Sequence, residues 1–306
     1  MNYGKRAHPL AVILILFINS ACVKQIEFPK NEFEDRLIVG SLISPNKPIE
    51  VYFSRLTDIA SDYPIVDLEK FIFELRKNND IITYSEFNEN RFLFIESVNA
   101  GDSFHLKLNY QDILVNASTC IPKQARGLTL TQSDSFHYNE TLNIDHPILT
   151  ASFSKVDGFI NYYECTALWQ GLRKNGEWTD MGNKNMLLVG KNKWKVSEIS
   201  EYTQFYAVFS DSLFKDSVYF QFIAPGAGSR GNIPHETWKI TLIVNSLSPE
   251  LYLYKKQLYK HRATKNNDLF AGPSVPVQLY SNINNGKGIF AGYSTATAEI
   301  IVEIKE

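Results

Sequence analysis

Ser103-Phe104-His105-Leu106-Lys107-Leu108-Asn109-Tyr110 alternates between polar and apolar side chains along its whole length. Successive side chains of a β-strand point to opposite faces of its sheet, so this alternation predicts a strand with one apolar face. The stretch therefore predicts β structure, and the flanking sequence extends that prediction in both directions.

Similar short runs lie on both sides of this stretch and are separated by turn-rich links. They are Arg36–Ile43, Ile49–Leu56, Lys70–Arg76, Ile81–Tyr84, Arg91–Ile95 and Ile113–Ala117. Short strands at a spacing of about ten to fifteen residues are typical of a β-sandwich. We predict an immunoglobulin-like β-sandwich at residues 36–125, with a boundary at Pro122-Lys123-Gln124-Ala125.

The second half of the chain is also rich in strand-like runs, although they are less regular. The clearest are Leu149–Phe153, Ile160–Leu168, Val218–Ile223, Thr237–Val244 and a long last strand, Gly288–Ile304, after a turn at Asn284-Asn285-Gly286. The chain contains 16 Tyr and 20 Phe, residue types that suit the pleated surface of a sheet. We predict an all-β protein whose residues 126–306 form a second, β-rich domain.

One helix stands out in this second domain, at residues 249–262. Ser248 can cap it, Pro249 suits its first turn and Glu250 complements the helix dipole. Leu251, Tyr254 and Leu258 share one face at helical spacing. We expect Lys255, Lys256 and Lys260 to form a solvated helix end, and contact with a membrane surface is the alternative.

The N-terminus has the features of an export signal. Lys5 and Arg6 precede the apolar run Pro9–Ile18. This run is too short for a membrane-spanning helix, which needs about 20 residues, but it suits the apolar core of a signal peptide. The small residues Ser20 and Ala21 then precede Cys22. We predict a signal peptide at residues 1–21.

Cys22 resembles the cysteine of the bacterial lipobox, whose thiol receives a diacylglyceryl group before the signal is removed. Asn19 departs from that pattern, in which the third residue before the cysteine is usually aliphatic. The alternative is a cysteine that stands there by chance. Two or three acyl chains anchor a protein stably, at about 0.8 kcal/mol per buried CH₂. We predict lipidation of Cys22 and a tether at residues 22–35.

The charge balance argues against nucleic-acid binding. The formal net charge is −2, and removal of Lys5 and Arg6 with the signal peptide would lower it to −4. A mildly acidic body lacks the basic surface that binds phosphate backbones. We therefore expect no nucleic-acid partner.

Cysteine and histidine usage predicts neither a metal site nor a cofactor. Cys120 and Cys165 could form a disulfide, but two small buried side chains are the favoured interpretation. His235-Glu236-Thr237-Trp238-Lys239 begins like a zinc-binding helix but lacks the second histidine. The histidines are otherwise far apart in the sequence, at positions 8, 105, 137, 146, 235 and 261.

Two further motifs lack the context that their chemistry needs. The glycine-rich stretch Gly226-Ala227-Gly228-Ser229-Arg230-Gly231 matches a dinucleotide-binding spelling, but Pro234 and a strand follow instead of a helix. We interpret it as a loop, with Gly226, Gly228, Ser229, Arg230 and Gly231 as candidates for contact with a partner. Ser212-Leu213-Phe214-Lys215 spells S-x-x-K without the companion motifs of penicillin-recognising enzymes, so we predict no catalytic residue there.

Several pieces of the mature chain resemble one protein family. They are Cys22 with its tether, Leu37-Ile38-Val39-Gly40, Asn161-Tyr162-Tyr163, Asp211–Asp216, Leu247–Tyr252 and Tyr280–Phe290. In order and content they are similar to the Bacteroidetes lipoproteins described as domain of unknown function 4249. The resemblance implies an outer-membrane lipoprotein of the cell envelope, facing the periplasm or the cell surface and often associated with TonB-dependent receptors. It implies no established activity.

The leading functional hypothesis is a non-enzymatic, lipid-anchored accessory protein that binds a partner or ligand near such a receptor. The alternatives are an envelope hydrolase acting on glycan or peptide, and a structural or adhesive surface module. Exposed aromatic side chains such as Trp169, Trp178 or Trp194 could stack on a ligand, although we expect tryptophans to pack in the core.

Overall fold

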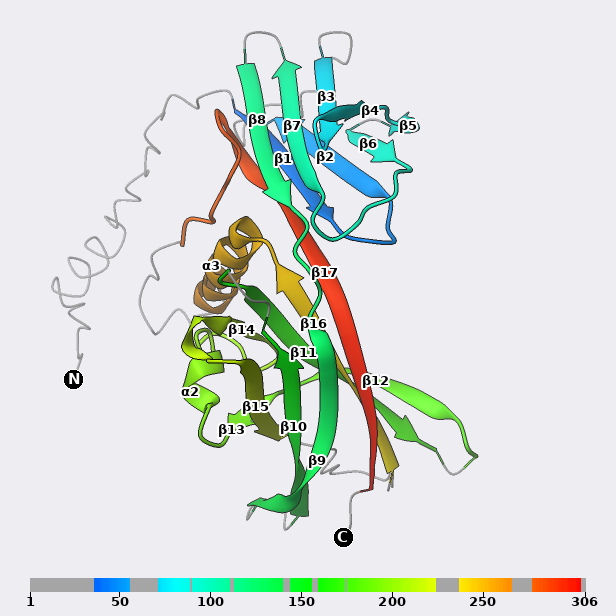
Figure 1. Ribbon diagram of the computed structural model, residues 1–306, viewed down its shortest axis with the longest axis vertical. Helices are drawn as coiled ribbons and strands as arrows, with labels where there is room; N and C mark the ends of the chain where they lie inside the picture. The colour runs from blue at the N-terminus through cyan, green and yellow to red at the C-terminus, as the bar shows by residue number, and fades with distance from the viewer. Residues whose placement is uncertain are drawn as a thin grey trace, which may run out of the picture. The chain divides into compact units, whose positions relative to one another are not determined.

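The structure of the chain is a computed structural model (Figure 1). It describes residues 36–55, 71–88, 90–110, 113–139, 144–155, 159–173, 175–223, 237–265 and 277–303. The predicted signal peptide, the tether and Cys22 lie outside these ranges.

Among the described residues, the sheet with the most strands, the long sheet, contains strands from both halves of the chain. In spatial order its strands are β12 (Trp178–Lys184), β11 (Tyr162–Leu172), β16 (Thr237–Leu247), β17 (Gly286–Glu303), β1 (Leu37–Ile43), β2 (Ile49–Arg55), β6 (Arg91–Phe94) and β5 (Glu86–Asn88). A further strand, β14 (Ala207–Ser210), pairs with residues 162–165 of β11. The clean alternation of buried and less buried residues in β16 shows how such a strand covers a core with one face.

β17 connects the two predicted domains within this sheet. Its residues 286–292 pair in parallel with β1, and its residues 293–303 pair antiparallel with β16. At Gly288 the backbone of β17 lies close to that of β1. Its φ is +114°, a conformation that glycine adopts readily because it has no Cβ atom. The division at residue 125 stays a prediction, and β17, from the predicted second domain, pairs with β1 of the predicted first domain.

A second sheet packs against the β1, β2 and β6 part of the long sheet. It has the order β4 (Asp80–Ile82), β3 (Phe71–Lys77), β7 (Ser103–Tyr110) and β8 (Ile113–Cys120). Buried side chains of both sheets form one core, among them Val39, Phe53, Phe104 and Leu106. The stretch 103–110 is a strand with Phe104, Leu106, Leu108 and Tyr110 buried, as its alternation predicts.

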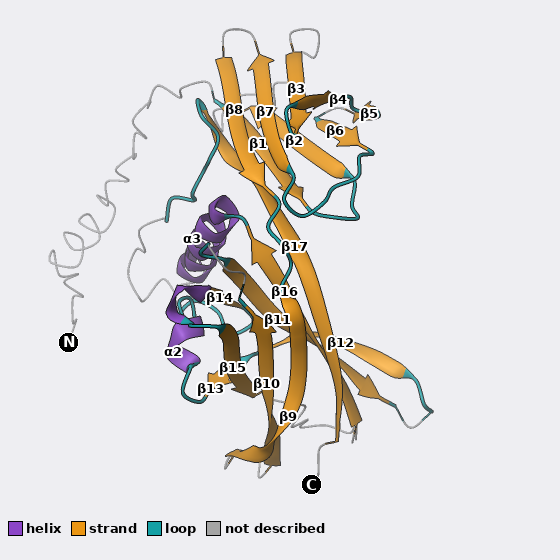
Figure 2. Cartoon of the chain, in the orientation of Figure 1, coloured by secondary structure: helices purple, strands orange, loops and turns teal. Residues whose placement is uncertain are grey.

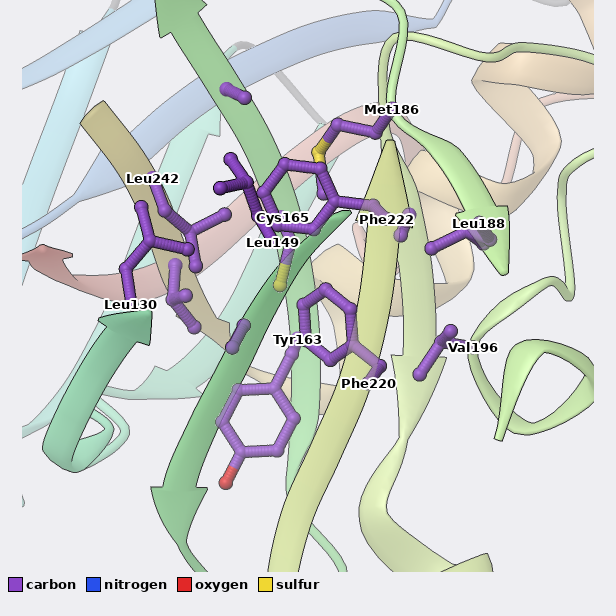
Figure 3. Packing of buried hydrophobic residues seen from close by; sticks show 14 of the residues in the cluster. Leu130, Leu149, Tyr163, Cys165, Met186, Leu188, Val196, Phe220, Phe222 and Leu242 are labelled. Atoms are coloured by element: carbon purple, nitrogen blue, oxygen red, sulfur yellow. The ribbon is translucent and has the colours of Figure 1, made fainter. Parts of the chain in front are cut away.

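A third sheet covers the other part of the long sheet. Its order is β13 (Leu187–Val189), β15 (Ser217–Ile223), β10 (Ile144–Ser154) and β9 (Arg126–Asn139). Figure 3 shows Leu149, Cys165, Phe220 and Leu242 converging from β10, β11, β15 and β16. This second core also contains Trp169 and Trp238, whose rings meet edge to face.

The described residues are mainly strand, as Figure 2 shows, so the predicted fold class is confirmed. Several elements that are short or polar are not predicted from the sequence. They are β5, β9, β12, β13, β14, the one-turn helix α2 (Lys193–Val196) and the 3₁₀ turn η2 (Asp211–Leu213). β9 has mostly exposed side chains at residues 131–137, so it lacks the apolar period that reveals a strand.

The predicted helix is present as α3 (Pro249–Lys265). The hydroxyl of Ser248 accepts a hydrogen bond from the backbone N–H of Leu251, which confirms its role as the cap. In the helix Leu251, Tyr252 and Tyr259 are buried, whereas Tyr254 and Leu258, which share a face with Leu251, are half-buried. Within the described residues, no helix is both long enough and apolar enough to cross a membrane.

The expected solvation of the lysines on α3 is wrong for two of the three. Lys255 pairs with Glu164 and Lys256 pairs with Glu198, and both carboxylates come from the body beneath the helix. The exposed Lys260 lies over the ring of Tyr202. Lys255 and Lys256 lie in the middle of α3 rather than at its C-terminal end, and their acidic partners are far from them in the sequence.

The two cysteines of the described residues are not joined to each other. Cys165 is buried in the second core, as predicted, whereas Cys120 is exposed at the end of β8, contrary to the expectation of a buried side chain. Burial raises the pKa of the Cys165 thiol, which therefore stays protonated at neutral pH.

Candidate functional site

The candidate site is a polar cleft of about 420 Å³ beside the outer face of the β3, β7 and β8 sheet. Its floor comes from these three strands, and its rim comes from residues 280–284 and from Glu250 at the start of α3. A volume of this size lies within the range of ligand sites, roughly 300–1,000 Å³. We call it the β7 cleft, defined by Glu74, Arg76, His105, Lys107, Leu114, Asn116, Ser118, Glu250, Tyr280, Asn282 and Asn284.

Strand register places the polar side chains of the floor in two parallel rows. Glu74 is opposite Lys107, which is opposite Asn116. One step along the same face, Arg76 is opposite His105, which is opposite Ser118. Side chains in directly opposite positions are about 5 Å apart, so each row is a continuous polar strip. The strips face outward because Leu75, Leu106 and Ala117, which alternate with them, are buried.

Asparagines of the 280–285 segment extend these rows beyond the edge of the sheet. Asn284 Nδ2 donates a 2.7 Å hydrogen bond to Asn116 Oδ1, and Asn282 Nδ2 donates one of 3.3 Å to the Ser118 carbonyl. Asn285 Nδ2 donates to the Leu114 carbonyl. The backbone N–H of Asn284 also binds the Asn116 carbonyl at 2.9 Å. The segment covers the edge of β8 and fixes one wall of the cleft.

Glu250 brings an acidic group to the rim of the cleft. It lies in the first turn of α3, where a carboxylate is favoured by the helix dipole. Its Oε2 atom is buried and has no hydrogen-bond partner among the described residues. Burial raises the pKa of the Cys120 thiol, and the charge of Glu250 raises it further by a smaller amount. The carboxylate of Glu250 is therefore close to that thiol. Glu250 therefore adds a carboxylate to the cleft lining, one oxygen of which is not engaged by any described residue.

A buried carboxylate on β11 holds α3 in place and so positions Glu250. Glu164 is 4% exposed, and its Oε1 atom accepts a 2.6 Å hydrogen bond from the hydroxyl of Tyr259. Lys255 Nζ lies 3.0 Å from the same oxygen, and Asn245 Nδ2 donates to Oε2 at 3.3 Å. Burial, with the charge of Glu164, raises the pKa of Tyr259, so its hydroxyl remains a donor.

A second carboxylate, Glu198, fixes the preceding turns of α3. Its Oε2 atom accepts hydrogen bonds from Tyr252 and, at 2.7 Å, from Lys256 Nζ. Burial, followed by the hydrogen bond to Glu198, raises the pKa of Tyr252 to about 12. The ring of Tyr252 also stacks on Tyr162 with 4.4 Å between centroids. Together the two carboxylates and their partners form what we call the α3 anchor: Glu164, Glu198, Tyr252, Lys255, Lys256 and Tyr259.

The cleft carries both signs of charge at close range. Arg76 Nε donates a 2.7 Å hydrogen bond to Glu74 Oε1, and this bond lowers the pKa of Glu74, with a smaller contribution from Lys107. Glu74 is therefore ionised at neutral pH and is already engaged by Arg76. Among the described residues, Lys107, His105 and the Ser118 hydroxyl have no hydrogen-bond partner. These donors, with Glu250 as acceptor, can bind a group that offers both signs of charge or several amides.

The residues predicted as functional from the sequence lie elsewhere. Cys22 and the loop residues Gly226, Gly228, Ser229, Arg230 and Gly231 are outside the described residues. Of the three tryptophans considered for stacking, Trp169 is fully buried, whereas Trp178 and Trp194 are 36% and 62% exposed. Ser212 lies on η2, where its hydroxyl pairs with that of Ser210. Within the described ranges, no three His, Cys, Asp or Glu side chains are grouped to hold a metal ion.

None of the cleft residues is predicted as a site from the sequence. The alternation at 103–110 does mark His105 and Lys107 as outward-facing, and Asn284-Asn285-Gly286 is predicted as a turn before the long last strand. What the sequence lacks is the register between β3, β7 and β8. That register alone brings Arg76, His105 and Ser118 into one row.

The protein is therefore a mainly-β sandwich with a polar cleft whose volume suits a ligand. Asparagine side chains cover the sheet edge beside that cleft. The family model of the domain of unknown function DUF4249 matches residues 23–299, so the chain belongs to that family. No curated protein matches the chain in sequence.

Proposed function

We propose that the protein is a lipid-anchored, non-enzymatic accessory protein of the outer membrane, and that its β7 cleft binds a polar loop of a TonB-dependent receptor. The observation that carries the proposal is the pair of cross-strand rows, Glu74–Lys107–Asn116 and Arg76–His105–Ser118. The lipid would be attached to Cys22, as the sequence motif predicts.

The composition of the cleft favours recognition of a protein segment. A polypeptide loop presents backbone donors and acceptors together with charges of both signs. The cleft offers Lys107 as a cation, Glu250 as an anion, and Ser118 and Asn116 as neutral hydrogen-bonding groups. Complementary charges of this kind set register and specificity more than they set affinity.

The rigidity of the cleft also supports binding. Its floor is a sheet whose opposite face is buried, one wall is tied to β8 by asparagine side chains, and the α3 anchor holds Glu250. Groups held before binding lose little conformational entropy when a partner arrives. Such preorganisation suits a binding surface on a stable scaffold.

Photo-crosslinking in the native envelope tests the proposal. A photoreactive residue at the position of Ser118, on the floor of the cleft, should give a covalent adduct with a TonB-dependent receptor after illumination. The matched control has the photoreactive residue at the position of Thr131, an exposed site on β9 away from the cleft lining. Adducts of equal yield from both positions, or none with a receptor from Ser118, would contradict the proposal.

The anchor is tested separately with labelled palmitate. Cells that produce the wild-type chain should transfer label to it, and Cys22→Ser should abolish the transfer. A wild-type chain that takes up no label would refute lipidation, whatever the crosslinking experiment shows.

A further inference from the structure

Four large apolar side chains are exposed on three neighbouring segments near β14 and the second core. Phe159 is 78% exposed, Ile160 is 57% exposed, Trp194 is 62% exposed and Leu213 is 47% exposed. Single exposed apolar residues are common on protein surfaces, but a group that includes Trp and Phe marks an interaction site. None of these four residues lines the β7 cleft.

Hydrogen bonds and ring contacts show that the three segments are neighbours. Asn161 donates from its backbone N–H and from Nδ2 to the two carboxylate oxygens of Asp211, at 3.0 and 2.8 Å. These bonds hold the Phe159–Ile160 turn beside η2, which carries Leu213. Lys195 Nζ lies over the ring of Phe214 at 4.8 Å and over that of Trp194 at 5.7 Å. The α2 turn is therefore adjacent to η2.

The same segments carry an excess of positive charge at the surface. Lys191, Lys193 and Lys215 are exposed, and Lys195 is half-buried against the two rings. Among the described residues at 191–196 and 211–216, the exposed acid is Asp216. Asp211 is fully buried and is engaged by Asn161 and Lys155. A chain with a net charge of −2 thus has a local basic surface around its exposed Trp and Phe.

We propose that Phe159, Ile160, Trp194 and Leu213, with the surrounding lysines, form a membrane-docking patch that inserts into an anionic phospholipid bilayer. Aromatic and aliphatic side chains enter the boundary between head groups and acyl chains, and lysines reach anionic head groups while their stems stay among apolar groups. The proposal rests on the proposed lipid anchor for the presence of the protein at a bilayer. The patch would then set the orientation of the body on that bilayer.

The charge excess distinguishes a bilayer from a protein partner as the occupant. A patch made for a protein interface would have its charges depleted at the centre, where Lys is disfavoured. Here Lys191, Lys193 and Lys215 are exposed on the same segments as Trp194 and Leu213, and Lys195 lies over the rings of Trp194 and the buried Phe214. A lysine in that position can extend its ammonium group to a lipid phosphate.

Quenching of tryptophan fluorescence by brominated lipids tests the patch. The lipidated chain is placed in vesicles of phosphatidylethanolamine and phosphatidylglycerol whose acyl chains carry bromine. Trp194→Phe should remove most of the quenching. The matched control is Trp178→Phe, which removes another partly exposed tryptophan, on β12, and should leave the quenching unchanged. Trp169 and Trp238 are buried and should contribute little to quenching.

Two results would overturn the proposal. One is quenching that Trp194→Phe leaves unchanged, and the other is quenching that depends on Trp178. Lys193→Glu with Lys215→Glu should reduce the quenching in anionic vesicles, and an undiminished signal would also refute the role of charge. Unlipidated Cys22→Ser protein added to the same vesicles separates the two proposals. Trp194-dependent quenching without the lipid would support the patch, whereas a wild-type chain that takes up no palmitate label would refute only the anchor.

Discussion

Tyr259 on α3 donates a 2.6 Å hydrogen bond to Glu164 on β11, across 95 positions of the sequence. The bond satisfies a carboxylate that is 4% exposed, and Lys255 contributes the balancing charge. A buried charge that loses a partner is costly, because no water replaces the lost group. The position of α3, and with it Glu250 at the cleft, therefore depends on this contact.

Removal of the Tyr259 hydroxyl tests this dependence. Tyr259→Phe should lower the free energy of unfolding by about 1.5–3 kcal/mol, the range for a hydrogen bond to a charged group. Tyr254→Phe is the control, because its half-buried hydroxyl on the same helix has no hydrogen-bond partner among the described residues. Urea unfolding followed by circular dichroism measures both variants. Equal stabilities of the two variants would show that the bond does not hold the helix.

Asp102 gives the first domain a predicted dependence on pH. Burial acts to raise its pKa, but the hydrogen bonds from Asn78 Nδ2 and the Asn99 backbone, both 2.8 Å, and the charge of Lys77 together lower it. A carboxyl group whose pKa is lowered by folding stabilises the folded state. This stabilisation is complete above the pKa of the unfolded state, about 3.9. That stability is lost as the pH falls through the folded-state pKa.

Asp102→Asn should remove this dependence while keeping the shape of the side chain. The difference in free energy of unfolding between wild type and variant should be largest at neutral pH and should shrink below about pH 4. Chemical unfolding at neutral pH and at pH values below 4 measures it. A difference that stays constant across this interval would mean that Asp102 is not ionised through these contacts.

Gly288 is the position where the backbones of β17 and β1 approach most closely. Its φ is +114°, and a Cβ atom there would lie 1.9 Å from the carbonyl oxygen of Val39. Gly288→Ala should therefore cost more than about 3 kcal/mol, because strain and a backbone clash add together. Gly40→Ala on β1 is the matched control, since nothing lies within 4 Å of its Cβ position. Thermal unfolding of the two variants should separate them clearly, and similar midpoints would contradict the close approach.

The fold class could be predicted from the sequence because alternation and aromatic content are local properties. The strand 103–110 and the cap at Ser248 are such cases, and both are confirmed. The contacts of buried acidic residues could not be predicted, because they depend on residues that are far apart in the sequence. Glu164 lies within an apolar run and has no local partner, and its contacts with Lys255 and Tyr259 arise only when α3 packs on β11.

The cleft illustrates the same limit. The outward faces of β7 and β8 follow from alternation, but the rows depend on which residues are paired across strands. The clearest feature of the sequence near the cleft is the asparagine-rich stretch at 284–286. By itself it predicts a turn and does not indicate a binding site. In the structure Asn285 of this turn, and Asn282 shortly before it, donate to backbone carbonyl groups of Leu114 and Ser118 along the edge of β8. Exposed edges of sheets need such cover, since their unpaired groups can recruit other strands.

Asn282 makes the most extensive of these contacts, and its substitution tests the edge cover. Its Nδ2 atom donates to the carbonyls of Phe290 and Ser118, at 2.7 and 3.3 Å, and its Oδ1 atom accepts from the backbone N–H of Phe290 at 3.0 Å. Asn282→Ala should cost about 2 kcal/mol, since each net hydrogen bond contributes roughly 0.5–1.5 kcal/mol. Urea unfolding measures the loss.

Asn282→Asp sharpens this test because it changes the chemistry and keeps the shape. A carboxylate at this position can still accept from Phe290, but it would place negative charge against two carbonyl oxygens that now receive a hydrogen bond. We expect Asn282→Asp to be less stable than Asn282→Ala at neutral pH and to recover part of the difference when the carboxyl is protonated at acidic pH. Uncovering of the β8 edge should also promote self-association, which light scattering would detect. An aspartate variant as stable and as monomeric as wild type would show that the donors of Asn282 do not cover the edge.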